Sequence, residues 1–99
     1  MKSIDYRSID GQLLRTFLMV LEESSVSGAA DRLGLTQSTV SHALGRLRAF
    51  FNDPLFVRSG QSMMPTERAV SLRPAVQDIL DGLQSLSHLR SFDPRSEEL

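Results

Sequence analysis

The sequence contains no cysteine among its 99 residues. Disulfides and thiolate metal sites are therefore excluded. No apolar run approaches the roughly 18 consecutive residues that a membrane-spanning helix needs, and the N-terminus MKSIDYRSIDG lacks the apolar stretch of a signal peptide. We therefore expect a cytoplasmic protein without membrane contact, formed by one small domain whose hydrophobic core has modest depth.

A large excess of charge of one sign is also missing, since the formal net charge is −1. This balance argues against a protein that coats nucleic acid by charge alone. The charges are unevenly placed, however, because residues 36–60 contain Arg46, Arg48 and Arg58 but only one acidic residue, Asp53. Positive charge is therefore concentrated on a central segment, which favours docking in a single orientation.

Residue groups that could perform catalysis or hold a metal ion are absent as well. The two histidines, His42 and His88, lie far apart in the sequence and have no acidic partner at metal-ligand spacing. No glycine-rich phosphate loop follows an expected strand. We therefore predict that the chain is not an enzyme, holds no metal and needs no cofactor.

The most informative stretch is residues 25–50, which predicts two short helices joined by a tight turn. In the first, Val26 to Leu33, apolar residues recur at the i, i+3, i+4 and i+7 positions of one helix face. Gly34 follows, where a helix end favours a residue that tolerates positive φ, and Thr36 is a good N-cap for a second helix at about 37–50. This pattern predicts a helix-turn-helix, in which small residues at the crossing let the two helices approach closely.

The second helix of this pair has one apolar face and one polar face. Val40, Ala43, Leu44 and Leu47 repeat at helical spacing, whereas the residues between them are polar and mostly short. Surface helices are usually filled with Glu, Lys and Gln, but this one carries hydroxyl groups near its start and almost no carboxylates. Such a face suits hydrogen bonding in the major groove of DNA, and a plain helical hairpin with a polar outer face is the alternative interpretation.

Upstream of this pair, residues 11–23 are expected to form a first helix that supports the other two. Asp10 is a suitable N-cap, and Phe17 is the expected aromatic anchor of the core. Residues 1–9 show no clear period, so we expect a flexible lead-in. The apolar stripe of the first helix consists of Leu14, Phe17, Leu18 and Leu21, with Leu13 and Val20 at its margins.

A short two-stranded hairpin, or wing, is predicted at about residues 55–64. An Asn-Asp-Pro sequence ends the preceding helix, an apolar β-prone run follows, and residues 59–62 have the composition of a turn. Because an isolated hairpin is marginally stable, the wing must pack on the helices through Phe56 and one of two adjacent methionines. Arg58 lies where the first strand enters the turn and can reach the minor groove of DNA, the alternative being an ordinary solvated charge.

Residues 66–92 are expected to form a long helix with Thr66 as its N-cap, and residues 93–99 to begin a hinge. The apolar residues of this helix follow a 3-4-3-4-3 spacing, which is typical of a coiled-coil seam and favours pairing with a second copy in a two-fold dimer. Folding of the helix back onto its own domain is the alternative. Pro74 either kinks the helix or marks a later start. The residues expected at the dimer interface are Leu72, Val76, Ile79, Leu80, Leu83 and Leu86.

Together these motifs resemble the N-terminal DNA-binding region of LysR-type transcriptional regulators over roughly residues 13–89. The resemblance implies a mainly α-helical winged helix-turn-helix, with three helices and a short two-stranded wing at residues 10–65, followed by a long linker helix for dimerisation. The segments that carry it are Ala29-Ala30-x-x-Leu33, Leu35-Thr36-Gln37-Ser38-x-Val40-Ser41, Leu44-x-x-Leu47, Pro54-Leu55-Phe56-Val57-Arg58 and Pro65-Thr66.

The resemblance also implies a function and its partners. It implies sequence-specific binding of double-stranded DNA at an interrupted palindrome, in the bacterial nucleoid, by a homodimer that could form a tetramer in the full-length protein. It implies a C-terminal effector-binding domain, absent from this chain, to which a small-molecule effector would bind. The residues expected to contact DNA are Ser27, Thr36, Gln37, Ser38, Thr39, Ser41, His42, Arg46, Arg58 and Gln61.

Several of these side chains also have a physical role of their own. Gln37 can pair bidentately with adenine, and Thr39 can offer its methyl group to thymine. Ser27, Ser41 and Arg46 suit phosphate contacts, which position a protein on DNA without specifying the sequence.

Four positions depart from the pattern of the family. His42 stands where arginine is common, Gln61 stands where a basic wing residue is common, and Ser38-Thr39 replaces a pair that frequently contains proline. These changes weaken electrostatic docking and leave the target sequence open. The alternative function is a protein-interaction module that uses a winged-helix scaffold and a coiled coil without reading DNA.

Overall fold

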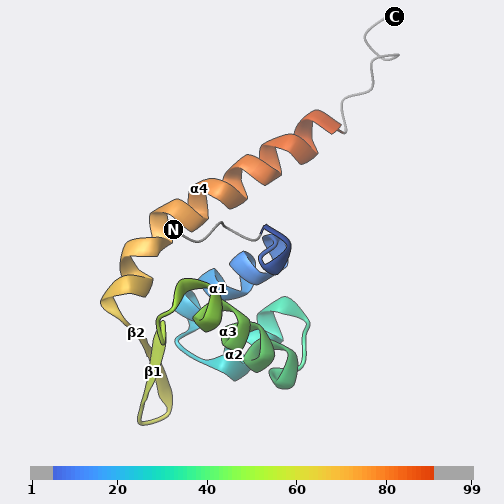
Figure 1. Cartoon of the computed structure of the whole chain (residues 1–99). Helices are drawn as coiled ribbons and strands as arrows, with labels where there is room; N and C mark the ends of the chain where they lie inside the picture. The colour runs from blue at the N-terminus through green and yellow to red at the C-terminus, as the bar shows by residue number, and fades with distance from the viewer. Residues whose placement is uncertain (1–5, 91–99) are drawn as a thin grey trace, which may run out of the picture.

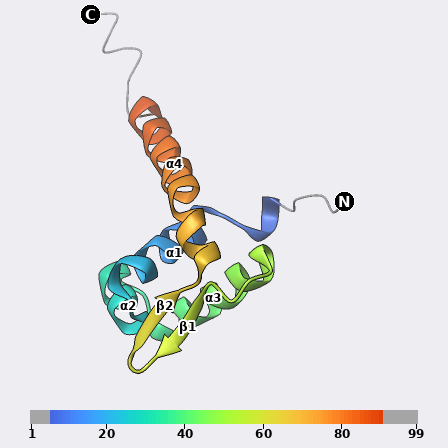
Figure 2. The ribbon, with the colours of Figure 1, turned by 90° about the vertical axis from the view of Figure 1, so that its left-hand side faces the viewer.

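The computed structural model describes residues 6–90 of the chain. The described elements are η1 (Tyr6–Ser8, a 3-10 helix), α1 (Gly11–Glu23), α2 (Val26–Leu33), α3 (Gln37–Phe51), β1 (Phe56–Ser59), β2 (Ser62–Pro65) and α4 (Glu67–Arg90). Helices α1, α2 and α3 form one body, and the wing and α4 leave this body on opposite sides (Figures 1 and 2). The predicted fold class is therefore confirmed.

Side-chain oxygens define the starts of the first three helices. Those of Asp10, Ser25 and Thr36 each accept a hydrogen bond from the backbone amide three residues further on, at 2.9, 2.9 and 3.1 Å. Each bond satisfies an amide that has no partner inside its helix. Gly34 ends α2 in the left-handed conformation, at φ 70°. The caps predicted at Asp10 and Thr36, and the turn predicted at Gly34, are thus confirmed.

The corner between α1 and α2 holds a left-handed residue that has a side chain. Ser24 has φ 54° and ψ 31°, and its amide donates to the carbonyl oxygen of Val20 at 2.8 Å. Left-handed backbone costs a residue with a Cβ atom more than it costs glycine. No local signal in the sequence marks this position, because serine is also a common N-cap residue.

We expect the Ser24→Gly variant to be more stable than the wild type by about 0.5–1 kcal/mol, since the left-handed strain of about 1–2 kcal/mol that it relieves exceeds the added chain entropy of about 0.4–1 kcal/mol. Urea unfolding followed by circular dichroism measures this difference. The Ser24→Ala variant is the matched control, because it lacks the hydroxyl but keeps Cβ, and it should show no gain. Equal stability of the two variants would contradict strain at this corner.

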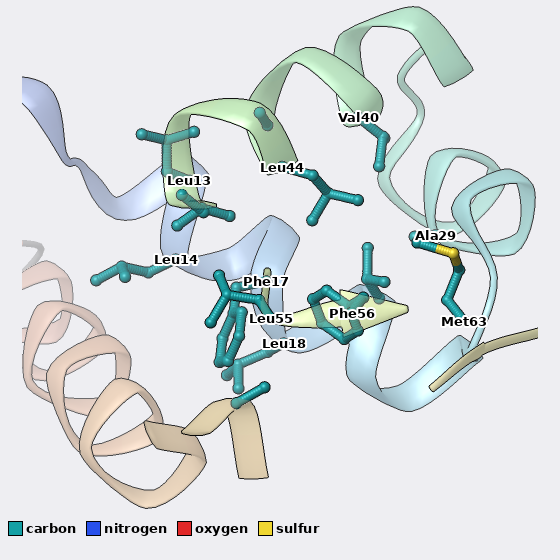
Figure 3. Close-up of a cluster of buried hydrophobic side chains, with 14 of the residues drawn as sticks. Leu13, Leu14, Phe17, Leu18, Ala29, Val40, Leu44, Leu55, Phe56 and Met63 are labelled. Atoms are coloured by element: carbon teal, nitrogen blue, oxygen red, sulfur yellow. The ribbon is translucent and has the colours of Figure 1, made fainter. Parts of the chain in front are cut away.

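The core is centred on Phe17, which has no exposed surface. Its ring centroid lies 5.7 Å from that of Phe56 in β1 and 6.5 Å from that of Phe51 in α3. Figure 3 shows the side chains of Leu44 and Leu55 among the same group of buried side chains. One aromatic side chain of α1 therefore holds both the second helix of the helix-turn-helix and the wing, as the sequence predicted for the core anchor.

The buried face of α1 is wider than the predicted stripe, and three of the four residues of that stripe are buried as expected. Leu13 and Val20 were expected at the margins, but they are 4% and 0% exposed, whereas Leu21 is only partly buried. The reason is that α1 contacts α2, α3 and α4 and so is surrounded on several sides. A stripe derived from one helix face underestimates burial in a central helix.

The wing is an antiparallel pair in which Phe56 faces Pro65 and Ser59 faces Ser62. Gly60 has φ 63° at the first position of the two-residue loop, as a type II′ hairpin turn requires. Met63 is buried at 7% exposure whereas Met64 is 48% exposed, so the predicted packing by Phe56 and one methionine is confirmed. The wing is also held by the amide of Met63, which donates to the carbonyl oxygen of Ser24 at 2.9 Å.

Helix α4 divides into a packed half and an exposed half. Ala69 and Val76 are buried in the domain core, and Leu72 and Leu80 pack against it. Every residue at 81–89 is exposed. The first half of α4 therefore folds back onto its own domain, whereas the second half presents a free face. Each of the two alternatives holds for one part of the helix.

Two expectations about the ends of the domain need correction. The lead-in at 1–9 was expected to lack regular structure, but Tyr6–Ser8 forms η1 and Ile9 packs against the core. Pro74 does not mark a later start of the long helix, because α4 begins at Glu67 and contains Pro74. The amide of Ala69 donates to Thr66 Oγ1 at 3.1 Å, which confirms the predicted cap. The predicted end at 92 and the hinge at 93–99 lie outside the described residues.

Candidate nucleic-acid interface

Helix α3 begins with a run of exposed polar side chains. Among residues 37–42, only Val40 is buried. Figure 3 shows Val40 and Leu44 pointing into the core. Helical spacing therefore turns Ser38, Ser41 and His42 away from the body. The residues that the sequence predicted as the reading surface lie together on one accessible face.

Thr36 and Thr39 are exposed, but their hydroxyl groups also contact each other. The two hydroxyl oxygens lie 2.8 Å apart, and Thr36 accepts the capping bond from the amide of Thr39. The pair therefore holds the first turn of α3 in place. A contact of either residue with DNA stays a prediction.

Helix α2 crosses α3 through small residues, as the helix-turn-helix pattern predicted. Ala29 and Ala30 are 0% and 2% exposed at this crossing. Ser27, a predicted phosphate contact, is exposed at the start of α2, with its hydroxyl oxygen 3.1 Å from that of Ser25. Its accessibility is compatible with the predicted phosphate contact.

The wing places its one arginine near the tip of the hairpin, next to the loop. Arg58 is exposed and is paired across the strands with the buried Met63, so both side chains lie on the face of the wing that turns toward the helices. Val57 and Met64 occupy the outer face and are 50% and 48% exposed. Gln61 is exposed in the loop. Arg58 and Gln61 are therefore both accessible at the free end of the wing.

The three arginines of the central segment differ in their surroundings. Arg46 is exposed, and its Nη2 donates to the carbonyl oxygen of Ser8 at 3.2 Å. Arg48 is half-buried, and its Nε donates to the carbonyl oxygen of Pro54 at 2.8 Å. The guanidinium of Arg48 thus has a structural role that sequence reasoning missed, because its partner belongs to the loop before the wing.

A second surface of interest is an apolar groove between the start of α1, the end of α3 and α4. Its volume is about 510 Å³, and Leu14, Phe51 and Val76 are among its lining residues. Ile79 and Leu83 also line the groove, and with Leu86 one turn further along α4 they are 51%, 46% and 61% exposed in chain order.

The predicted dimer residues therefore separate into two sets. Val76 is 3% exposed inside its own domain, and Leu72 and Leu80 are partly buried against the core, so a contact of these three with a partner stays a prediction. Ile79, Leu83 and Leu86 keep the exposure that a partner helix would cover. Gly11 approaches the free set closely, since a Cβ atom on Gly11 would lie 3.3 Å from Leu83 Cδ1.

The described part of the chain offers little support for other chemistry. Across residues 6–90, no three His, Cys, Asp or Glu residues gather in a way that could hold a metal ion. Within the same range, no helix combines the length and apolar character that crossing a membrane requires. His42 lies on α3 and His88 on α4, on different elements as predicted.

Comparison with known proteins identifies the family. Residues 12–70 match the family of bacterial regulatory helix-turn-helix proteins described as the lysR family. The transcriptional activator NahR of Pseudomonas putida is 44% identical over 96 residues, which are 96% of this chain and 32% of NahR. The activator NagR of a Ralstonia species is 46% identical over 92 residues, which are 92% of this chain and 31% of NagR. The chain thus spans about a third of the length of these relatives.

Solved structures agree with this assignment. A probable transcriptional regulator of Pseudomonas aeruginosa has a TM-score of 0.76 and 42% identity, covering 89% of this chain and 30% of that one. The DNA-binding domain of CbnR in its DNA complex shares the fold, with a TM-score of 0.75 at 24% identity over 92% of this chain and 100% of that one. The matched helix-turn-helix is a DNA-binding domain and not an enzymatic one. The chain therefore belongs to the lysR family of bacterial regulatory helix-turn-helix proteins.

Proposed function

We propose that this domain reads double-stranded DNA in a sequence-specific manner, with α3 in the major groove and the wing at the adjacent minor groove. The single observation that carries the proposal is the exposed polar run at 37–42, which is interrupted only by the buried Val40. A helix that is fixed by its apolar face and accessible along a face of short hydrogen-bonding side chains fits the major groove.

Within this proposal, the predicted side chains divide into two kinds of contact. Gln37, Ser38 and His42 face base edges, where their donors and acceptors discriminate between base pairs. Ser27, Ser41 and Arg46 contact phosphates and fix the register of the domain. Arg58 enters the minor groove, whose negative potential favours a guanidinium, and Gln61 lies beside it.

We further propose that two copies bind together at an interrupted palindrome and pair through the second half of α4. Support comes from Ile79, Leu83 and Leu86, which are exposed apolar residues of α4 and continue its apolar seam. A two-fold axis between helices matches a two-fold symmetric site on DNA. The domain would work in the nucleoid, and no cofactor takes part in the proposed DNA contacts.

The proposal predicts different effects for variants at the two grooves. Gln37→Ala should weaken binding to the selected site by about 1–3 kcal/mol and relax base preference at one position. Arg58→Ala should weaken binding to all sequences and lower the slope of log affinity against log salt by about one per domain. Selection of duplexes from a random pool identifies the site, and titration of that duplex at several salt concentrations measures both effects.

Matched variants on α4 serve as controls. Gln84→Ala and Arg73→Ala remove the same side chains from exposed positions of that helix, and both should bind DNA like the wild type. No enrichment of any duplex by a folded chain would contradict the proposal and favour the protein-interaction module. Enrichment of single half-sites would agree with sequence-specific DNA binding but would contradict pairing of two copies through α4.

A further inference from the structure

The segment before the wing and the residue after it are joined by a compact set of hydrogen bonds. Asp53 Oδ2 accepts from the amide of Leu55 and from Thr66 Oγ1, both at 2.8 Å. The amide of Thr66 donates to the carbonyl oxygen of Leu55, also at 2.8 Å. We call Asp53, Leu55 and Thr66 the wing clasp.

The wing clasp fixes a backbone conformation that its residues would not adopt alone. Leu55 is a non-glycine residue at φ 65° and has no exposed surface. A left-handed leucine is unfavourable and persists only where surrounding contacts hold it. The bond from its amide to Asp53 and the burial of its side chain supply those contacts. The direction in which the chain enters β1 therefore depends on the Asp53 carboxylate.

The same clasp connects α3 and the wing, which carry the proposed DNA-binding surface, with the start of α4. Thr66 Oγ1 caps α4 by accepting from the amide of Ala69 at 3.1 Å, while its hydroxyl hydrogen goes to Asp53. Arg48 of α3 holds the carbonyl oxygen of Pro54, next to the clasp. The end of α3, both ends of the wing and the start of α4 thus meet at one point.

We propose that Asp53 and Thr66 are positioning residues for DNA binding, which hold the wing, and Arg58 on it, in the place where Arg58 meets the minor groove. This inference rests on the proposed wing contact. The loop of the wing extends beyond the helices (Figure 2), and the buried Met63 opposite Arg58 is held by its bond to Ser24, so loss of the clasp lets the base of the wing turn about Met63 and shifts Arg58. Loss of the clasp is therefore expected to lower the affinity for DNA by weakening the contact that Arg58 makes.

The test compares the effect of Arg58→Ala in two backgrounds of the full chain, the wild type and Thr66→Val. Valine keeps the shape of threonine but cannot donate to Asp53 or cap α4. Thr66→Ser is the matched variant, because it keeps the hydroxyl. Binding to the selected duplex is titrated at a temperature at which circular dichroism shows every variant folded, and hydroxyl-radical footprinting reports minor-groove protection beside the wing.

We expect Thr66→Val to weaken binding by about tenfold and Thr66→Ser by less than about twofold, in line with the loss of a hydrogen bond to a charged group. Arg58→Ala should then cost much less in the Thr66→Val background than in the wild type, because the two changes remove the same contact. The minor-groove protection should be lost in Thr66→Val and kept in Thr66→Ser.

Other outcomes overturn the inference in distinguishable ways. An equal cost of Arg58→Ala in both backgrounds would show that the clasp does not act through Arg58, while leaving the proposed function intact. If Arg58→Ala does not weaken DNA binding in the wild-type background, Arg58 makes no contact with DNA. The inference then fails together with the proposed wing contact. If Thr66→Val does not fold, Asp53→Ala, which removes the oxygen that accepts both clasp hydrogen bonds, replaces it in the same cycle.

Discussion

Replacing Phe17 by alanine is expected to destabilise the domain by about 3–5 kcal/mol, because a fully buried aromatic side chain is lost and a cavity is left. Domains of this size have about 5–15 kcal/mol of stability in total, so the variant should be near its limit of folding. The effect is large because the ring of Phe17 contacts Phe51 of α3 and Phe56 of β1 at once. Both DNA-facing elements lose their support together.

Thermal unfolding measures this effect, since 1 kcal/mol corresponds to about 4–8 °C in a domain of this size. Phe17→Leu keeps most of the buried volume and should lose clearly less stability. Met64→Ala is the surface control, because Met64 is 48% exposed on the outer face of the wing. A melting temperature of Phe17→Ala within a few degrees of the wild type would show that the core is not centred on this ring.

Replacing Leu86 by aspartate is expected to abolish dimerisation while leaving the domain folded. Leu86 is 61% exposed and lies beyond the last residue of α4 that packs on the core. In the proposed dimer it is covered by the partner helix, and two-fold symmetry places two carboxylates there without counter-charges. An unpaired buried charge costs about 3–5 kcal/mol, which raises the dimer dissociation constant by at least about a hundredfold.

Sedimentation equilibrium measures this change, and DNA titration reports its consequence. Leu86→Asp should bind a full palindrome no more tightly than a single half-site, whereas its half-site affinity should equal that of the wild type. Ser87→Asp is the matched control, because it adds the same charge to the neighbouring exposed residue. Unchanged mass and palindrome affinity in Leu86→Asp would mean that α4 does not pair through this face.

Local sequence patterns were enough to predict the helices and strands of this protein and the face expected to read DNA. The caps at Asp10 and Thr36, the turn at Gly34 and the spacing of Val40, Leu44 and Leu47 all depend on residues a few positions apart. Local backbone geometry decides such features, so periodicity and capping chemistry predict them. The exposed polar run of α3 follows from the same spacing, because a helix with one buried face must present the other.

The way in which the helices and the wing are joined depends on contacts between residues that are far apart in the sequence. In the sequence, Asp53 marks a helix end and Thr66 marks a helix cap. The hydrogen bond between them joins residues 13 positions apart and forms only in the folded wing. Leu55 in a left-handed conformation is tolerated because burial and that clasp hold it. Likewise, Val76 and Leu86 follow one apolar period, yet one is buried and the other is exposed. The helical period predicts which face of α4 is apolar. How far along the helix the domain covers that face depends on the whole fold.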